Sequence, residues 1–336
     1  MSLARTIAVP IALILAASAT ARADTWIVAP GLEGAPEYGE RIREAAAAWQ
    51  KAASEAGAEF RGIDDGQGAT AEALKAAVEA EAARPAAEAG RLWIILIGHG
   101  SYDGRSAKFN VIGPDVAPGD LAGWLGESGR PAAVLALFAS SSPFLDLGAG
   151  RGDRLAVSAT KSPAEQNYAY FAEHFAKALA APDSDLDGDG GLSLLEGFLY
   201  AARSVEEFFE REGRIATEQA LIDDSGDGKG TPAAFFKGMR AAEKPSGAKA
   251  SDGFRSNQWY LRPPPSEKDA PPELLAERDA LELEIAKLRD EKASLGEDRY
   301  YAELEPLLVR LARIYALIDG PAERRENSGP AAGSVE

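Results

Sequence analysis

The stretch LWIILIGHG, residues 92–100, is a run of six apolar residues that ends in glycine, histidine and glycine. The residues at 92–97 are apolar at odd and even positions alike, so a β-strand there would be apolar on both faces. Strands of this kind lie inside a parallel sheet that is covered on both sides. The stretch therefore predicts an α/β fold, and it places His99 just beyond the end of a buried strand.

Strands and helices alternate along the chain on both sides of this stretch. We expect strands at 25–28, 59–63, 92–97, 132–139 and 155–160, helices at 40–56, 70–83, 119–126 and 168–180, and a hairpin at 108–116. This alternation predicts a mainly parallel sheet flanked by helices. In such sheets, ligands bind beyond the carboxyl ends of the strands.

The chain begins with features of a secretory signal. Arg5 precedes an apolar stretch at 7–17 that is too short to span a bilayer, and Ala21 and Ala23 form a small-x-small cleavage site. We expect residues 1–23 to be a signal peptide and the protein to be periplasmic or secreted, with no membrane span.

The composition limits the possible partners and chemistry. The formal net charge is −17, which disfavours nucleic acid because phosphates need Lys and Arg opposite them. Cations and basic peptides suit this charge better. The sequence contains no cysteine, which excludes disulfides and thiolate catalysis.

Composition also predicts where the domains end. We expect an α/β domain at 24–242, a proline-rich linker at 243–272, a helical hairpin at 273–319 and a disordered tail at 320–336. In the hairpin, leucine recurs every seven residues, at Leu274, Leu281, Leu288 and Leu295. The simpler interpretation is that this stripe only packs. The alternative is that 273–319 binds a partner or mediates self-association.

A second apolar run ends in hydroxyl groups. The expected strand at 132–139 is followed directly by Ser140, Ser141 and Ser142. Histidine beyond one strand and serine beyond the next are side chains that act as general base and nucleophile when they meet. Taken from the residues alone, His99 is equally consistent with a structural histidine. The other histidine, His174, falls within an expected helix and is interpreted as a packing or surface residue.

The order strand-His-Gly and then strand-Ala-Ser-x-Ser resembles the caspase-like peptidases, the legumain type most closely. The resemblance extends over 25–236 as an order of elements, although few motif residues support it. It implies that His99 stands at the base, that Gly100 contributes to the oxyanion hole, and that Ser140 stands where the family has its catalytic cysteine. The stretch at 158–171, SATKSPAEQNYAYF, also resembles the legumain region that shapes the substrate pocket.

The departures from the family concern the chemistry itself. A hydroxyl needs a well-aligned base to lose its proton, whereas a thiol ionises readily. The family's orienting asparagine after the first strand has no counterpart in APGLEG at 29–34, and no carboxylate partner for His99 can be assigned. We therefore expect a catalytically degenerate peptidase homologue that binds a peptide or protein. The alternatives are an active Ser-His peptidase or esterase, and a calcium-stabilised envelope scaffold that binds partners through the hairpin.

The stretch DLDGDGGLSLLE, residues 185–196, has the ligand spacing of an EF-hand calcium loop. Hard oxygen ligands at this period surround one Ca²⁺, with glycine at the sixth position for the sharp turn. The predicted ligands of this structural calcium ion are Asp185, Asp187, Asp189, the Gly191 carbonyl, Ser193 and Glu196. The alternative is an acidic turn that binds only water.

A second acidic stretch, DDSGDGKG at 223–230, has the same beginning but a different end. Asp223, Ser225 and Asp227 occupy the first, third and fifth positions, whereas Ala234 occupies the twelfth. We interpret it as an Asp/Gly turn, and its binding of a cation stays open because no carboxylate in the stretch closes the loop.

Overall fold

The computed structural model describes residues 22–64 and 66–318. The expected signal peptide lies outside these residues except for its last two positions, and the expected tail lies wholly outside them. Within the described ranges, no helix has the length and apolar character needed to cross a bilayer.

A seven-stranded sheet forms the centre of the molecule, in the order β10-β9-β7-β6-β3-β1-β2. Its strands are β1 (Thr25–Pro30), β2 (Glu59–Gly62), β3 (Leu92–Ile97), β6 (Ala132–Leu137), β7 (Arg154–Ser158), β9 (Leu221–Asp223) and β10 (Thr231–Pro232). The first five of these are parallel, and β9 and β10 complete one edge in antiparallel pairing. The predicted mainly parallel sheet is confirmed.

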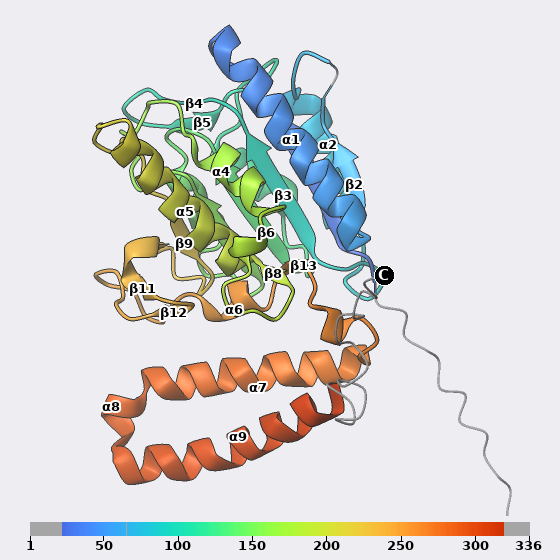
Figure 1. The fold of residues 1–336 in the computed structure, drawn as a ribbon. Helices are drawn as coiled ribbons and strands as arrows, with labels where there is room; N and C mark the ends of the chain where they lie inside the picture. Colours follow the sequence, from blue (N-terminus) through green and yellow to red (C-terminus); the bar gives the residue numbers. More distant parts are fainter. Residues whose placement is uncertain (1–21, 65, 319–336) are drawn as a thin grey trace, which may run out of the picture.

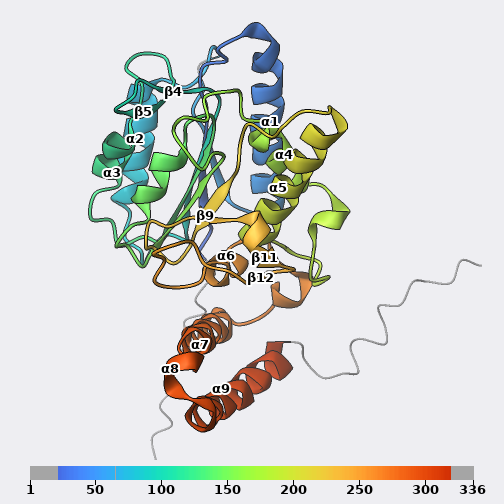
Figure 2. The same ribbon diagram turned by 90° about the vertical axis from the view of Figure 1, so that its left-hand side faces the viewer.

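Helices cover both faces of the sheet (Figures 1 and 2). One face carries α1 (Pro36–Ala56), α4 (Phe171–Ala178) and α5 (Leu194–Arg211), and the other carries α2 (Ala71–Ala82) and α3 (Pro118–Leu125). Successive residues of β3 point to opposite faces, so Trp93 and Ile95 join one core and Ile94 and Leu96 join the other. This is why the run at 92–97 has to be apolar at every position.

The hairpin after β3 begins earlier than expected. Its strands are β4 (Gly100–Tyr102) and β5 (Ala107–Phe109), and Val116 adds only an isolated bridge to Phe109. The reason is a tight turn at Asp103, whose carboxylate accepts hydrogen bonds from the backbone amides of Arg105 and Ser106, at 2.8 Å each. The hairpin therefore follows His99 immediately.

The segment at 243–272 differs from the linker expected from its composition. It contains α6 (Phe254–Asn257) and β13 (Tyr260–Arg262), and β13 pairs with β8 (Leu192–Ser193) in antiparallel fashion. Trp259 and Leu261 are buried in the core beneath α1 and α5. Apolar residues within a proline-rich and polar stretch thus tie it to the α/β domain.

Short elements complete the domain and connect it to the C-terminal helices. They are η1 (Ser142–Leu147), η2 (Pro182–Ser184), η3 (Ala233–Phe235), η4 (Pro265–Glu267), β11 (Phe236–Lys237) and β12 (Arg240–Ala241). Of these, η1 packs against β7 and α3, whereas η2 and η3 pack against α5.

The C-terminal part is the predicted helical hairpin. It consists of α7 (Pro272–Asp290), α8 (Lys292–Leu295) and α9 (Glu297–Ile318), and it lies beneath the α/β domain in both ribbon views (Figures 1 and 2). Arg278, which interrupts the leucine stripe, is buried and pairs with Glu267 and Asp279. The ion pairs explain how a charge is accommodated on the inner side of α7.

Candidate peptide-binding site and acidic loops

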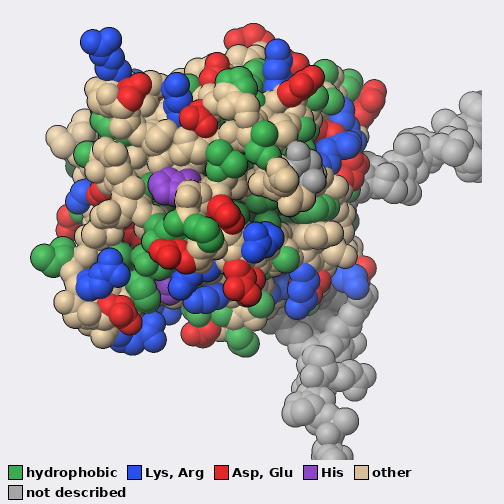
Figure 3. All heavy atoms as spheres, turned by 90° about the horizontal axis from the view of Figure 1, so that it is seen from above, with side chains coloured by type: hydrophobic (Ala, Val, Ile, Leu, Met, Phe, Trp, Pro, Cys, Tyr) green, Lys and Arg blue, Asp and Glu red, His purple; other side chains and the backbone are tan. Residues whose placement is uncertain are grey.

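The ends of β3 and β6 bring His99 and Ser140 to the same edge of the sheet. The two strands are adjacent, and Ile97 is paired with Leu137. Beyond these two strands the segments that follow them are in close contact, because a Cβ atom built on Gly100 would lie 2.0 Å from the carbonyl oxygen of Ala139. Figure 3 looks onto this end of the molecule and shows histidine atoms at the surface, among interspersed acidic and basic side chains.

Ser140 has an unusual backbone and an enclosed side chain. Its φ of 61° makes it the one non-glycine residue with positive φ among the described residues, a conformation that costs an L-residue about 1–2 kcal/mol. Its amide donates a 2.9 Å hydrogen bond to the carbonyl of Glu165. The side chain is 0% exposed, and its hydroxyl has no hydrogen-bond partner among the residues at 22–64 and 66–318. The hydroxyl is therefore closed to a substrate in this conformation.

His99 is half-buried and packs against the loop that follows β1. Its Nδ1 lies 3.0 Å from the carbonyl oxygen of Gly100. A Cβ atom at Gly34, whose φ is +70°, would lie 2.3 Å from the imidazole Cδ2. No hydrogen bond joins His99 to Ser140 or to a carboxylate within the described ranges. The ring is held by backbone contact, without the acidic partner that serine hydrolases use.

The other histidine belongs to the core. His174 lies on α4, is 6% exposed and contacts the ring of Phe208. Burial lowers its pKa to about 4, so the imidazole is neutral at physiological pH. This placement agrees with the packing role expected from the sequence.

The loop at 185–196 brings together the three aspartates of the predicted calcium site. Carboxylate oxygens of Asp185, Asp187 and Asp189 lie within 4.8 Å of one another. Burial, together with the neighbouring negative charges, raises the pKa of Asp189. Asp185 accepts the amides of Gly188 and Gly190, which wraps the loop around its first residue. Three mutually repelling carboxylates form a site that a cation would neutralise.

The remaining predicted ligands belong to the same loop, and each of them already takes part in a hydrogen bond. The Glu196 carboxylate is buried and accepts the amides of Leu186, at 2.8 Å, and of Ser193, at 2.7 Å. The Ser193 hydroxyl donates to Glu196, and the Gly191 carbonyl accepts from Arg262. The donor set therefore fits calcium in kind, with the three aspartates forming the convergent part of it.

The second acidic loop has the same internal hydrogen bonds as the first. Asp223 accepts the amides of Gly226, at 2.8 Å, and Gly228, at 2.7 Å, which are the fourth and sixth loop positions. Asp185 accepts the amides at those same two positions of its own loop. The two loops thus share one backbone arrangement around their first aspartate.

Asp252 supplies the carboxylate that the second loop lacks. It accepts the amides of Asp224 and Ser225, the second and third loop positions, and the hydroxyl of Thr231, the ninth. In the first loop Glu196 accepts from the second, third and ninth positions in the same way. Asp252 comes from the segment at 243–272, so spacing within 223–234 could not reveal it. It is a residue that the sequence analysis missed.

The chain was compared with known proteins. No protein-family model matches it, and no curated protein matches it. Among solved structures it is similar to caspase-1 from Spodoptera frugiperda, with a TM-score of 0.41 and 11% sequence identity over 61% of this chain and 86% of that chain. A likeness at this level assigns neither a family nor an activity to the chain.

Proposed function

We propose that this protein is an exported homologue of the caspase-like peptidases that binds a peptide at the strand ends of His99 and Ser140 without hydrolysing it. The observation that carries the proposal is the state of Ser140, whose hydroxyl is fully buried and unpartnered. The motif order strand-His-Gly and strand-Ala-Ser-x-Ser supports the relationship, and the adjacency of β3 and β6 supports a shared site.

The arrangement lacks two requirements of a serine hydrolase. A nucleophilic hydroxyl must donate to its base, and Ser140 donates to no group in the described part of the chain. In serine hydrolases a carboxylate also stabilises the imidazolium, and among the described residues His99 has no such partner, since its Nδ1 bonds to the carbonyl of Gly100. The active Ser-His peptidase or esterase therefore has less support than a binding role.

Chemical labelling tests this proposal directly. The full chain is treated with a fluorophosphonate probe, and adducts are located by mass spectrometry of peptides. We expect no adduct at Ser140, and we expect S140A to bind peptides as tightly as the unchanged protein. Labelling at Ser140 that disappears in H99A would establish the hydrolase instead.

We also propose that the loop at 185–196 holds one structural calcium ion. Asp185, Asp187 and Asp189 would bind it directly, and Glu196, whose carboxylate accepts the Leu186 amide, would close the loop. The ion would link the loop to α5, because Ser193 is the N-cap of that helix and Glu196 lies in its first turn. The export proposed above supports this assignment, because extracellular calcium modules work at millimolar concentrations.

A second candidate function is that of a scaffold that self-associates through α9. Five of the eight large hydrophobic side chains that are exposed in the described ranges lie on this helix: Tyr301, Leu308, Val309, Tyr315 and Leu317. Sedimentation velocity of the full chain tests it. A dimer that dissociates in the double variant L308E/L317E would support the scaffold, and a monomer at all concentrations would remove it.

A further inference from the structure

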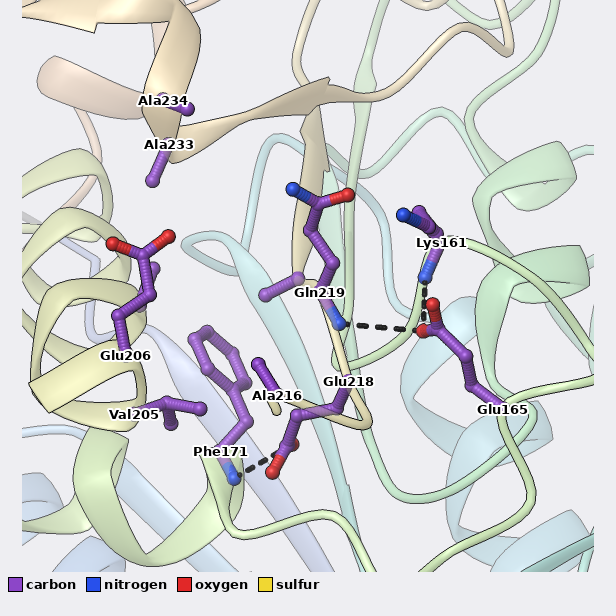
Figure 4. A pocket seen from close by; sticks show the side chains of 12 residues that line it. Lys161, Glu165, Phe171, Val205, Glu206, Ala216, Glu218, Gln219, Ala233 and Ala234 are labelled. Carbon is purple, nitrogen blue, oxygen red and sulfur yellow. Dashed lines mark hydrogen bonds between the residues drawn. The ribbon is translucent and has the colours of Figure 1, made fainter. Parts of the chain in front are cut away.

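A small cavity lies between the segment at 161–171, α5 and the segment at 216–220. Its volume is about 140 Å³, and Lys161, Glu165, Phe171, Glu206, Glu218 and Gln219 are among its lining residues (Figure 4). Glu165 connects it to the strand-end site, because the carbonyl of Glu165 accepts the amide of Ser140. Pockets for whole drug-sized ligands begin at about 300 Å³. The size suits one side chain of a longer ligand.

Three carboxylates line this cavity, and none of them forms an ion pair with any described Lys or Arg: Glu165, Glu206 and Glu218. Lys161 also lines the cavity, and its charge partly offsets the rise that burial causes in the pKa of Glu165. Neutral backbone groups hold two of the carboxylates. Glu218 accepts the amides of Tyr170 and Phe171, and Glu165 accepts those of Lys161 and Gln219. These bonds orient the carboxylates but add no positive charge.

The electrostatic cost of burying a carboxylate here without an ion pair is seen in the pKa of Glu218. The residue is 6% exposed, and burial with the nearby charges of Glu165 and Glu173 raises its pKa to about 8. A cation entering the cavity would offset this desolvation and repulsion. An acidic side chain would add to the repulsion.

Apart from Lys161 and Gln219, the rest of the lining is apolar. Phe171, Val205, Ala233 and Ala234 form walls beside the carboxylates (Figure 4). Lys and Arg combine an apolar stem with a positively charged end. The stem would contact the apolar walls, and the charged end would reach the carboxylates. A metal ion or a free ammonium group would leave the apolar walls without contact.

We propose that this cavity receives a lysine or arginine side chain of the peptide that binds at the strand ends. The inference rests on the proposed peptide-binding function and names its ligand: a basic peptide, held by the carboxylates of Glu165, Glu206 and Glu218. The net charge of −17 draws such a peptide toward the protein.

The test uses the full chain and four fluorescent peptides that are identical except for one residue, which is Lys, Arg, Gln or Glu. Binding is measured by fluorescence anisotropy at low salt. We expect the Lys and Arg peptides to bind at least about tenfold more tightly than the Gln and Glu peptides, and high salt to reduce the difference.

Two variants tie the preference to this cavity. Because Glu206 is exposed, E206Q should weaken Lys and Arg binding roughly two- to fivefold and leave the Gln peptide unchanged. E210Q removes the same charge from α5 outside the cavity and should have no such effect. A234K adds a cation on the cavity wall and should abolish the preference for basic peptides.

The outcomes distinguish a failure of this inference from a failure of the proposed peptide-binding function. If all four peptides bind equally, or if E210Q acts like E206Q, the cavity is not the determinant and peptide binding alone stands. If no peptide binds, both proposals are overturned.

Discussion

The carbonyl oxygen of Ala139 lies 2.0 Å from the position that a Cβ atom at Gly100 would occupy. The two residues follow neighbouring strands, so this contact fixes how closely the His99 and Ser140 segments approach. A side chain at Gly100 would also meet the ring of Phe138, at 2.5 Å. The strand-end site depends on a glycine at this point for reasons of space, whatever chemistry it performs.

The first prediction concerns this contact. G100A should lower the free energy of unfolding by about 1–3 kcal/mol, because the new methyl group must displace backbone as well as side-chain atoms. G123A is the matched control, since Gly123 lies in α3 with nothing within 4 Å of its Cβ position. That variant should be stabilised by about 0.5–1 kcal/mol. Chemical denaturation of both checks the prediction, and equal effects would contradict it.

The second prediction compares two adjacent buried serines. S140A removes a hydroxyl that has no partner, so we expect the free energy of unfolding to be unchanged or to rise by about 1 kcal/mol. S141A removes a hydroxyl that accepts the amide of Ala159 at 3.0 Å and bonds to Thr160, and should cost about 1–3 kcal/mol. Thermal and urea unfolding measure both. A loss of stability in S140A as large as that in S141A would show that the Ser140 hydroxyl is bonded in solution.

The third prediction is that calcium raises stability through the loop at 185–196. With the millimolar affinity of extracellular modules, 10 mM Ca²⁺ should add about 1.4–2.7 kcal/mol to the free energy of unfolding relative to EGTA. D187N should reduce this gain, and D183N, just outside the loop, should not. An identical melting temperature in calcium and EGTA would refute the site.

Isothermal titration gives the stoichiometry of calcium binding. A second ion that is lost in D252N would belong to the loop at 223–231.

The fourth prediction concerns pH and Glu218. Its folded pKa of about 8 lies above the usual value of 4.5, so the folded state retains a proton that the unfolded chain has lost between these pH values. The contribution of Glu218 to the free energy of unfolding is fully present below pH 4.5 and is lost as the pH rises toward 8. E218Q should flatten this part of the pH profile by at most about 5 kcal/mol. Unfolding measured from pH 4 to 9 checks it, and a profile that is unchanged in E218Q would contradict it.

Local pattern was sufficient for much of the fold. The run at 92–97 had to be a doubly covered strand, because each of its residues is apolar and a strand presents alternate residues to opposite faces. The leucine repeat of α7 likewise predicted the helical hairpin. Both are patterns within one short stretch of sequence, at 92–97 and at 274–295, which is why they can be recognised without the rest of the chain.

The sequence by itself determined the parallel sheet, the order of His99 and Ser140 at successive strand ends, and the spacing of the aspartates at 185–189. The tertiary structure decided that the Ser140 hydroxyl is enclosed, that Asp252 closes the second acidic loop, and that Glu218 lies buried beside Glu165. Each of these three features depends on residues that are distant from one another in the sequence. No local pattern encodes which of them will meet, since packing of the whole domain brings them together.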